Sequence, residues 1–269
     1  MSRIPFHGIF RLAVVLGFVP GLPAGSSRAG TFSPGEGQGQ MIAGVGYVEA
    51  ARSFDSTGKA VVEPAFRKLE AGAYFEYGLS DWVTLIVAPS LVHMSAGAPA
   101  VSYSGSSESA IGAQFRLFGS QTQALSIQAL VEPGIGRSVA SPAFGDPNGW
   151  AGNIKLQFGQ AFTLFDRPAF VDAGAGAEIY GGGWPDEGRF DATFGIRPWT
   201  YTLFLVQDFT RAAPEAGPAI PRIFATTLQL SLVQDLSARW SVQIGALRTL
   251  AGCNAARETG PVAALWMRF

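Results

Sequence analysis

Residues 76–93, EYGLSDWVTLIVAPSLVH, combine a short polar turn with a long alternating segment. Val83, Leu85, Val87 and Leu91 fall on one face of that segment, and polar residues are among those on the other. Alternation with a period of two indicates a β-strand with one apolar and one polar face. An aromatic residue stands on each side of the GLSD turn, where a soluble hairpin would expose it to water. The stretch therefore predicts a strand hairpin in an unusual environment.

The same arrangement recurs in residues 233–245, VQDLSARWSVQIG, and alternating runs continue through most of the chain. In residues 109–118, for example, Ile111, Ala113, Phe115 and Leu117 share one face. Long amphipathic stretches with a helical period are absent. The runs predict about twelve strands, which cover residues 38–49, 66–77, 82–94, 107–118, 124–136, 149–164, 168–181, 188–197, 200–210, 222–234, 239–250 and 260–269.

The connections between these predicted strands alternate between short and long. The short ones are GLSD, GSQTQ, residues 166–168, residues 198–199 and DLSAR. The long ones, rich in Gly, Pro, Ser and charge, lie near residues 53–63, 95–106, 138–146, 182–187, 211–221 and 252–259. Tight periplasmic turns and longer external loops are typical of up-and-down barrels of the bacterial outer membrane. An even number of strands places both termini on the periplasmic side.

Composition favours a membrane barrel over a soluble sheet. Charged residues make up 14% of the chain, against about 25% in soluble domains. The apolar face of most strands is nearly free of charge for about ten residues, which matches the height of a bilayer core. In lipid, a sheet satisfies its backbone groups only by closing on itself. We therefore expect an all-β fold, an up-and-down antiparallel transmembrane β-barrel of about 12 strands, over residues 30–269. A secreted β-sandwich or a small soluble ligand-binding barrel is the alternative.

The N-terminus has the layout of a secretory signal peptide. Arg3 and Arg11 are basic, residues 12–19 form a short apolar run, and Ser27 and Ala29 suit a cleavage site. We expect residues 1–29 to be removed on export; a membrane-anchoring or soluble N-terminal segment is the alternative. No later window is long and apolar enough for a transmembrane helix.

Other features exclude several classes of function. The net charge of −1 gives no electrostatic basis for binding nucleic acid. Cys253 is the only cysteine, so the chain can form no internal disulfide and has no cysteine cluster for a metal. No motif implies a cofactor, a metal ligand set or a nucleotide-binding loop.

The chain ends in PVAALWMRF, in which Ala263, Leu265, Met267 and the terminal Phe269 share a face. A last apolar strand with a C-terminal Phe resembles the assembly signal of bacterial outer-membrane barrels. The resemblance implies that the barrel-assembly machinery and the lipids of the outer membrane are partners, and that the protein reaches this membrane through the periplasm of a Gram-negative cell.

The run YGLSDWVTL, preceded by FRKLEAGAYFE, resembles uncharacterised proteobacterial outer-membrane barrels described as transporter-like. With the GQGQMI start and the WMRF end, the resemblance covers most of the mature chain. More loosely, the chain is similar to barrels associated with phenol degradation and fatty-acid uptake, although twelve strands are fewer than fatty-acid transporters carry. The resemblance implies a fold and a location; it transfers no substrate-binding residue.

The polar faces of the predicted strands carry ionisable residues that would line the barrel interior. The candidates for lumen lining and selectivity are Lys68, Glu70, Glu76, Arg116, Glu132, Lys155, Asp172, Glu178, Asp191 and Arg197. Glu108, Arg189 and Asp208 are added to the same interior set. The mixed signs indicate a paired network with a slight acidic surplus. In a barrel of this size large side chains nearly fill the interior, so a narrow pore, a gated transporter and a closed lumen all remain open.

His93 and Ser95 form a His-x-Ser pair, the arrangement that outer-membrane lipid deacylases and phospholipases use. His93 is in phase with Leu91, so it should face lipid near the outer rim. Glu108 is in phase with inward residues and cannot easily orient it. We expect a rim histidine and no catalytic residue.

Aromatic residues recur beside the predicted short turns and would form one ring at the periplasmic headgroup level. They are Tyr77, Trp82, Phe118, Phe165, Trp199, Tyr201, Trp240 and Phe269. The expected function is an outer-membrane channel or transporter for small solutes through a narrow, charge-lined lumen. The alternative is a non-transport barrel, either structural or a lipid-modifying enzyme that uses His93 and Ser95.

Overall fold

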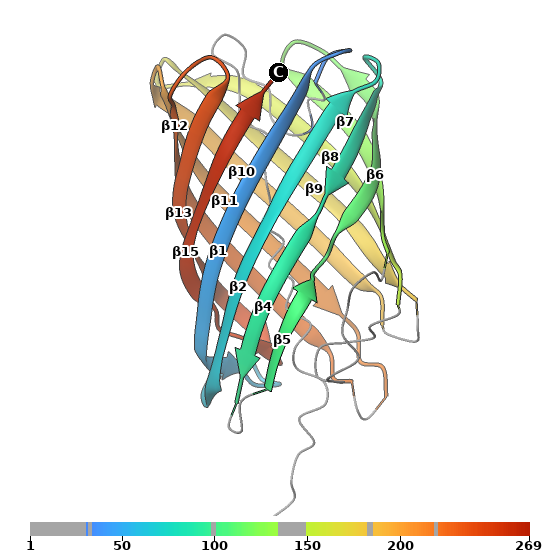
Figure 1. The fold of residues 1–269 in the computed structure, drawn as a ribbon, viewed down its shortest axis with the longest axis vertical. Coiled ribbons are helices and arrows are strands. Elements are labelled where there is room, and N and C mark those ends of the chain that lie inside the picture. Colours follow the sequence, from blue (N-terminus) through green and yellow to red (C-terminus); the bar gives the residue numbers. More distant parts are fainter. Residues whose placement is uncertain (1–30, 32–33, 98–100, 134–148, 182–184, 218–219) are drawn as a thin grey trace, which may run out of the picture.

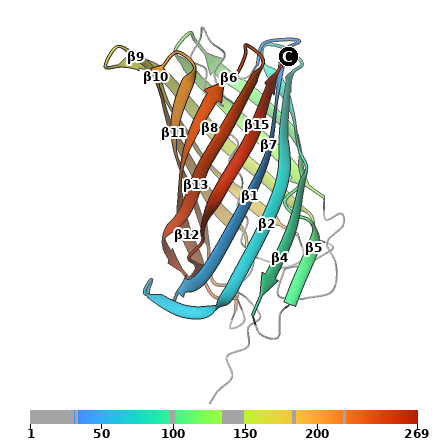
Figure 2. The ribbon, with the colours of Figure 1, turned by 60° about the vertical axis from the view of Figure 1, so that its left-hand side comes forward.

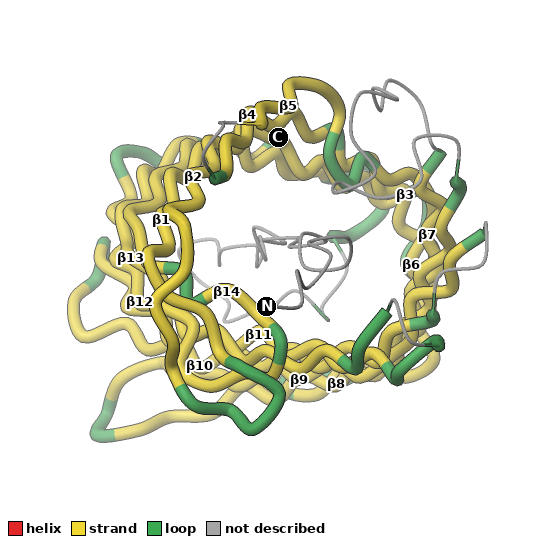
Figure 3. Tube along the Cα trace, turned by 90° about the horizontal axis from the view of Figure 1, so that it is seen from below, coloured by secondary structure: helices red, strands yellow, loops and turns green. Residues whose placement is uncertain are grey.

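The strands close into a twelve-stranded antiparallel barrel, which confirms the all-β barrel expected from the alternation (Figures 1 and 3). The computed structural model describes residues 31, 34–97, 101–133, 149–181, 185–217 and 220–269. No helix in this part of the chain is long and apolar enough to cross a membrane. The predicted signal peptide, residues 1–29, lies outside the described residues.

Fifteen strand segments build the barrel. They are β1 (Gly39–Phe54), β2 (Ala60–Gly78), β3 (Val83–Ala88), β4 (Ser90–Ala96), β5 (Val101–Ser106), β6 (Ala110–Gly119), β7 (Gln123–Glu132), β8 (Ala151–Leu164), β9 (Arg167–Tyr180), β10 (Glu187–Trp199), β11 (Thr202–Ala213), β12 (Ile223–Asp235), β13 (Trp240–Cys253), β14 (Ala255–Ala256) and β15 (Thr259–Arg268). Segments β3 and β4 form one barrel strand and β5 and β6 form the next, while β14 only extends the ladder beside the end of β1.

Two neighbouring barrel strands are interrupted at the same height. Pro89 separates β3 from β4, because proline has no N–H to donate to a ladder. Beside it, residues 107–109 separate β5 from β6, and the Ser107 N–H donates to the carbonyl of Ser90 at 3.0 Å. The predicted strand 82–94 is therefore broken, and the predicted strand 107–118 is preceded by a further segment that alternation did not reveal.

The C-terminal strand closes the barrel. Strand β1 pairs with β2 on one side and with β15 on the other (Figure 2). The main chains of Gly39 and Phe269 exchange two hydrogen bonds of 2.8 and 3.0 Å. The rings of Phe75 and Phe269 stack with centroids 5.7 Å apart on the outside.

The short turns all lie at one end of the barrel, the upper end in Figure 1, which we call the turn end; the opposite end is the loop end. In GLSD, the Ser80 hydroxyl accepts the N–H groups of Trp82 (3.3 Å) and Val83 (3.2 Å). In DLSAR, the Ser237 hydroxyl accepts the Arg239 and Trp240 N–H groups in the same way. The two similar sequences thus share one turn-capping mechanism. The β8–β9 turn instead has two residues with positive φ, Phe165 and Asp166, as a two-residue hairpin turn that follows the twist of its strands requires.

Alternate residues of each strand face the interior, which we call the lumen, and the others face outward. The outward positions are mainly apolar and exposed, as at Leu91 (65% exposed), Ile244 (64%) and Leu156 (50%). The inward positions hold nearly all of the buried polar and charged side chains. Large apolar side chains outside and charged ones inside reverse the arrangement of a soluble barrel.

Candidate functional site

All ten residues proposed as lumen lining lie on the inner face of their strands. Lys68, Glu70, Glu76, Glu132, Glu178 and Arg197 are buried, and Arg116, Lys155, Asp172 and Asp191 are half-buried. Several of them contact charged or polar neighbours on the inner face. The candidate site is therefore the lumen itself, described here from the loop end to the turn end.

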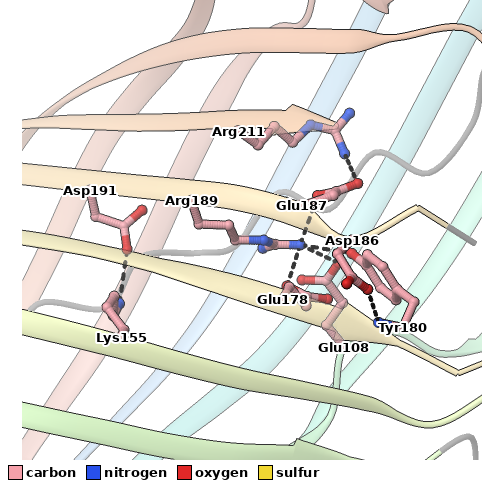
Figure 4. A network of polar contacts seen from close by, with 9 residues as sticks. All are labelled: Glu108, Lys155, Glu178, Tyr180, Asp186, Glu187, Arg189, Asp191 and Arg211. Carbon is pink, nitrogen blue, oxygen red and sulfur yellow. Dashed lines mark hydrogen bonds and ion pairs between the residues drawn. The ribbon is translucent and has the colours of Figure 1, made fainter. Parts of the chain in front are cut away.

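At the loop end, Arg189 on β10 lies among several carboxylates (Figure 4). Its Nη2 is 2.6 Å from Glu178 Oε2, 3.4 Å from Glu187 Oε2 and 3.5 Å from Glu108 Oε1. It also donates to the Tyr180 hydroxyl at 3.2 Å, and Arg211 lies 3.9 Å from Glu187. We call these residues, Glu108, Glu178, Tyr180, Glu187, Arg189 and Arg211, the loop-end cluster. One guanidinium thus holds three acids that come from β9, β10 and the break between β5 and β6.

Two further groups of charges extend the loop-end cluster along the wall. On β2, Lys68 Nζ lies 3.2 Å from Glu70 Oε2, and Ser90 donates to Glu70 at 2.8 Å. Nearer the middle, Lys155 and Asp191 pair at 2.8 Å. A buried ion pair contributes little net stability, but leaving one member unpaired is costly. Removal of one member of these pairs should therefore destabilise the barrel.

At the turn end, Asp235 is held by three donors. Arg197 lies 2.8 Å from it, Arg268 lies 3.5 Å away, and the Ser241 hydroxyl donates at 2.6 Å. Arg197 was expected in the lumen from its alternation, but Asp235 and Arg268 were not.

Thr31 lies inside the lumen, ahead of the first strand, and is fully buried. Its N–H donates to Asp172 at 2.8 Å and its hydroxyl donates to the same carboxylate oxygen. Its carbonyl accepts from Ser126 (3.0 Å) and Gln114 (3.3 Å). Three strands, β6, β7 and β9, thus bind a residue that is not part of any barrel strand. No pattern in the sequence indicated this contact, because a lone threonine before the first strand resembles any linker residue.

The inner face near the turn end also carries an apolar cluster, which the expectation of a polar lumen missed. It consists of Ile42, Ala124, Phe170, Leu203, Leu205, Val233 and Trp266. Trp266 satisfies its indole N–H by donating to Gln243 at 3.0 Å. Gly195 makes room for this cluster, since a Cβ at that position would overlap the Phe170 ring. Apolar side chains thus pack against one another on the inner face near the turn end.

The assignment of Asp208 to the lumen is wrong. Strand β11 buries Leu203, Leu205 and Gln207 inward, so Asp208 faces outward. Its carboxylate accepts the hydroxyls of Thr226 (2.7 Å) and Thr210 (2.9 Å). Both faces of β11 are apolar near the turn end, so polarity alone suggested the wrong side.

Several lumen residues were not expected from sequence. They are Glu187, Arg211, Asp235, Glu258 and Arg268, all inward or buried. Counting every second residue from a known inward position along β10, β11 and β15 would have identified Glu187, Arg211 and Arg268 as inward. Glu258 precedes β15 in an irregular segment, where residues do not alternate between two faces.

Three of the carboxylates come close enough to share a cation. Oxygens of Glu108, Glu132 and Glu178 lie within 4.8 Å of one another. The guanidinium of Arg189 already contacts two of them, and it supplies the positive charge that a metal ion would otherwise bring.

His93 faces outward and is exposed, as expected. Its Nδ1 lies 2.6 Å from the Ser104 hydroxyl on β5 rather than from Ser95. Glu108, the acid that follows it across the next loop, is on the inner face with Arg189. The pair His93–Ser95 of the alternative enzyme hypothesis is therefore not assembled, and an outward His–Ser104 contact takes its place.

The aromatic residues expected at the periplasmic interface all lie at the turn end. Trp82, Phe118, Phe165, Trp199, Tyr201, Trp240 and Phe269 are exposed, and Tyr77 is half-buried. They come from five different turns and the chain end, so they encircle the barrel at one height.

Comparison with known proteins identifies the architecture. An outer-membrane channel from Pseudomonas putida F1 has a TM-score of 0.71 and 15% sequence identity, over 91% of this chain and 100% of that one. The translocator domain of the autotransporter NalP from Neisseria meningitidis has a TM-score of 0.55 and 10% identity, over 89% of this chain and 91% of that one. The NanC porin has a TM-score of 0.51 and 9% identity, over 85% of this chain and 100% of that one.

No family model and no curated protein matches the chain. These comparisons therefore do not identify the transporter-like family that the sequence resembles. At such low identities the solved structures establish the outer-membrane type of barrel fold, and the function must be argued from the lumen.

Proposed function

We propose that the protein is a bacterial outer-membrane channel or transporter that passes small solutes through its charge-lined lumen. The observation that carries this proposal is the opposite polarity of the two faces: paired charges inside and apolar side chains outside. The neighbouring channel and porin structures are consistent with it. Export, insertion through the C-terminal strand and an interface ring at the turn end complete the proposed setting.

The charge balance of the lumen favours cations. Among the described residues, the inward or buried acids are Glu70, Glu76, Glu108, Glu132, Asp172, Glu178, Glu187, Asp191, Asp235 and Glu258. The bases are Lys68, Arg116, Lys155, Arg189, Arg197, Arg211 and Arg268. Ten acids against seven bases leave an acidic surplus, and rings of acids select cations in pores.

Planar-bilayer recording of the refolded protein tests the proposal. We expect small unitary conductance steps with a reversal potential that indicates cation preference. Asp172→Ala should raise the conductance, because it removes the acceptor that holds Thr31 in the lumen. Thr202→Ala, on the outer face of β11, is the control and should leave it unchanged. Absence of conductance together with absence of solute uptake by liposomes would contradict the proposal.

The enzyme alternative has a separate readout. Hydrolysis of a phospholipid by the refolded wild type, lost in His93→Ala, would support it. The outward position of His93 means that this variant should not change conductance.

A further inference from the structure

Three outward-facing charges lie on neighbouring strands of one side of the barrel, toward the loop end. Glu49 on β1, Arg67 on β2 and Arg248 on β13 are exposed and alternate with outward apolar residues. On β6 to β10, the outward positions in the described residues are apolar at the same level, as at Val131, Ile154, Ile179 and Phe190.

The strand register places these three charges in one row. Arg248 lies opposite Thr259, Thr259 opposite Glu49, and Glu49 opposite Arg67. The arginines are thus three strand spacings apart, or about 14 Å along the wall at about 4.8 Å per spacing. Glu49 lies between them.

The row lies where the far headgroups of a bilayer would be. Arg67 is ten residues from Tyr77 at the turn end (77 − 67), and Arg248 is eight from Trp240 (248 − 240). A tilted transmembrane strand crosses the hydrocarbon with about 9–11 residues. Arg side chains of this kind extend their charged heads to the interface while their stems cover apolar surface.

Within the described part of the chain, the side chains of Arg67, Arg248 and Glu49 form no ion pair or hydrogen bond. By contrast, the single side chain of Arg189 in the lumen contacts three acids. The remaining outward carboxylate on this side, Asp208, has both oxygens bound by threonine hydroxyls.

We propose that Arg67 and Arg248 bind a phosphorylated lipid headgroup in the leaflet at the loop end. The inference rests on the membrane placement given under the proposed function. A guanidinium forms two parallel hydrogen bonds with phosphate, which makes it the side chain best suited to this ligand. Glu49 between the arginines repels a phosphate at the midpoint. The site therefore fits a headgroup with two phosphates about 14 Å apart, one on each arginine.

Lipid titration of the purified protein in phosphatidylcholine nanodiscs tests this. The probes are a bisphosphorylated disaccharide lipid and phosphatidylglycerol, with binding followed by native mass spectrometry. We expect the wild type to prefer the bisphosphorylated lipid, Arg67→Gln and Arg248→Gln each to weaken binding several-fold, and the double variant to weaken it at least tenfold. Arg239→Gln is the matched control, because Arg239 is exposed at the turn end.

Equal binding of the bisphosphorylated lipid by the double variant and the wild type would overturn the inference, as would a loss of the same size in Arg239→Gln. Retained gel-shift heat modifiability of each variant shows that it is folded. Conductance separates this proposal from the first: the double variant should conduct like the wild type, because the solute path lies inside the barrel. Lipid binding without conductance would contradict only the channel.

Discussion

Adjacent residues of β2 show how differently the two faces of the wall hold charge. Lys68 and Glu70 face inward, are buried and lie 3.2 Å apart. Arg67, one residue away, faces outward, is exposed and has no ion pair among the described residues. Leu69, the next outward residue, is 46% exposed. The inner face holds charges such as Lys68 and Glu70 in contact with one another, whereas Arg67 on the outer face has its charge toward the loop end of the barrel.

We expect the largest loss of stability when Arg189, which contacts three acids on the inner face, is replaced. Arg189→Met would leave Glu108, Glu178 and Glu187 without the guanidinium that holds them. Removal of one partner from a buried ion pair costs about 3–5 kcal/mol. Urea unfolding in lipid vesicles, followed by tryptophan fluorescence, should show a loss of this size. Arg239→Met, in an exposed turn, should change little; an equal effect of the two variants would mean that the lumen charges are fully hydrated.

A charge placed on the outer face at mid-height should cost nearly as much. Leu156 faces outward on β8 and is 50% exposed. Leu156→Arg should destabilise the barrel by about 2–4 kcal/mol, the cost of Arg at the midplane of a transmembrane barrel. Lys155→Arg, one residue away and inward, keeps the contact with Asp191 and is the control. Equal unfolding midpoints for the two variants would argue against a lipid-facing wall.

Substitution of the turn serines should have a smaller effect. Ser80→Ala removes the hydroxyl that accepts two backbone N–H groups in GLSD, and Ser237→Ala does the same in DLSAR. Each net hydrogen bond contributes about 0.5–1.5 kcal/mol. Water can replace the hydroxyl as the acceptor for these exposed N–H groups. We therefore expect each variant to lower the free energy of unfolding by about 1 kcal/mol in the same assay. Ser102→Ala, at an exposed position on β5, should have no measurable effect.

The smallest effect concerns Asp55, in the loop after β1. The Thr57 hydroxyl, then the Lys59 and Thr57 N–H groups, donate to Asp55 and lower its pKa. Because the pKa of Asp55 is lower in the folded than in the unfolded state, its ionised carboxylate stabilises the fold at pH values above the unfolded pKa. This stabilisation is lost as the pH falls through the folded pKa. The stability difference between wild type and Asp55→Asn should therefore be greatest at neutral pH and vanish in strong acid. A difference that grows on acidification would show that the sign is wrong.

The sequence was sufficient to predict the barrel fold and most of the residues that line its lumen, because the period of two identifies both faces of a strand at once. It succeeded at Lys155 and Glu178, where the opposite face is clearly apolar. It failed at Asp208, where both faces of β11 are apolar and a single polar residue could not fix the phase. It failed at Thr31 and Glu258 for another reason: their positions depend on tertiary contacts of irregular segments, which carry no period.

The break at Pro89 shows an intermediate case. The proline was visible in the sequence, and its missing N–H predicts an interrupted ladder. The interruption of the neighbouring strand at residues 107–109 could be seen only once the register placed it beside Ser90.

The central claim, that solutes pass through the lumen, is tested most directly by a pair of neighbouring cysteines. In a Cys253→Ser background, Asn153→Cys faces the lumen opposite Glu178, and Ile154→Cys faces outward. A charged, membrane-impermeant thiol reagent is added while single-channel current is recorded. We predict a stepwise fall in current for Asn153→Cys and no change for Ile154→Cys. Unaltered current in the labelled Asn153→Cys protein, or a fall only in Ile154→Cys, would contradict the account.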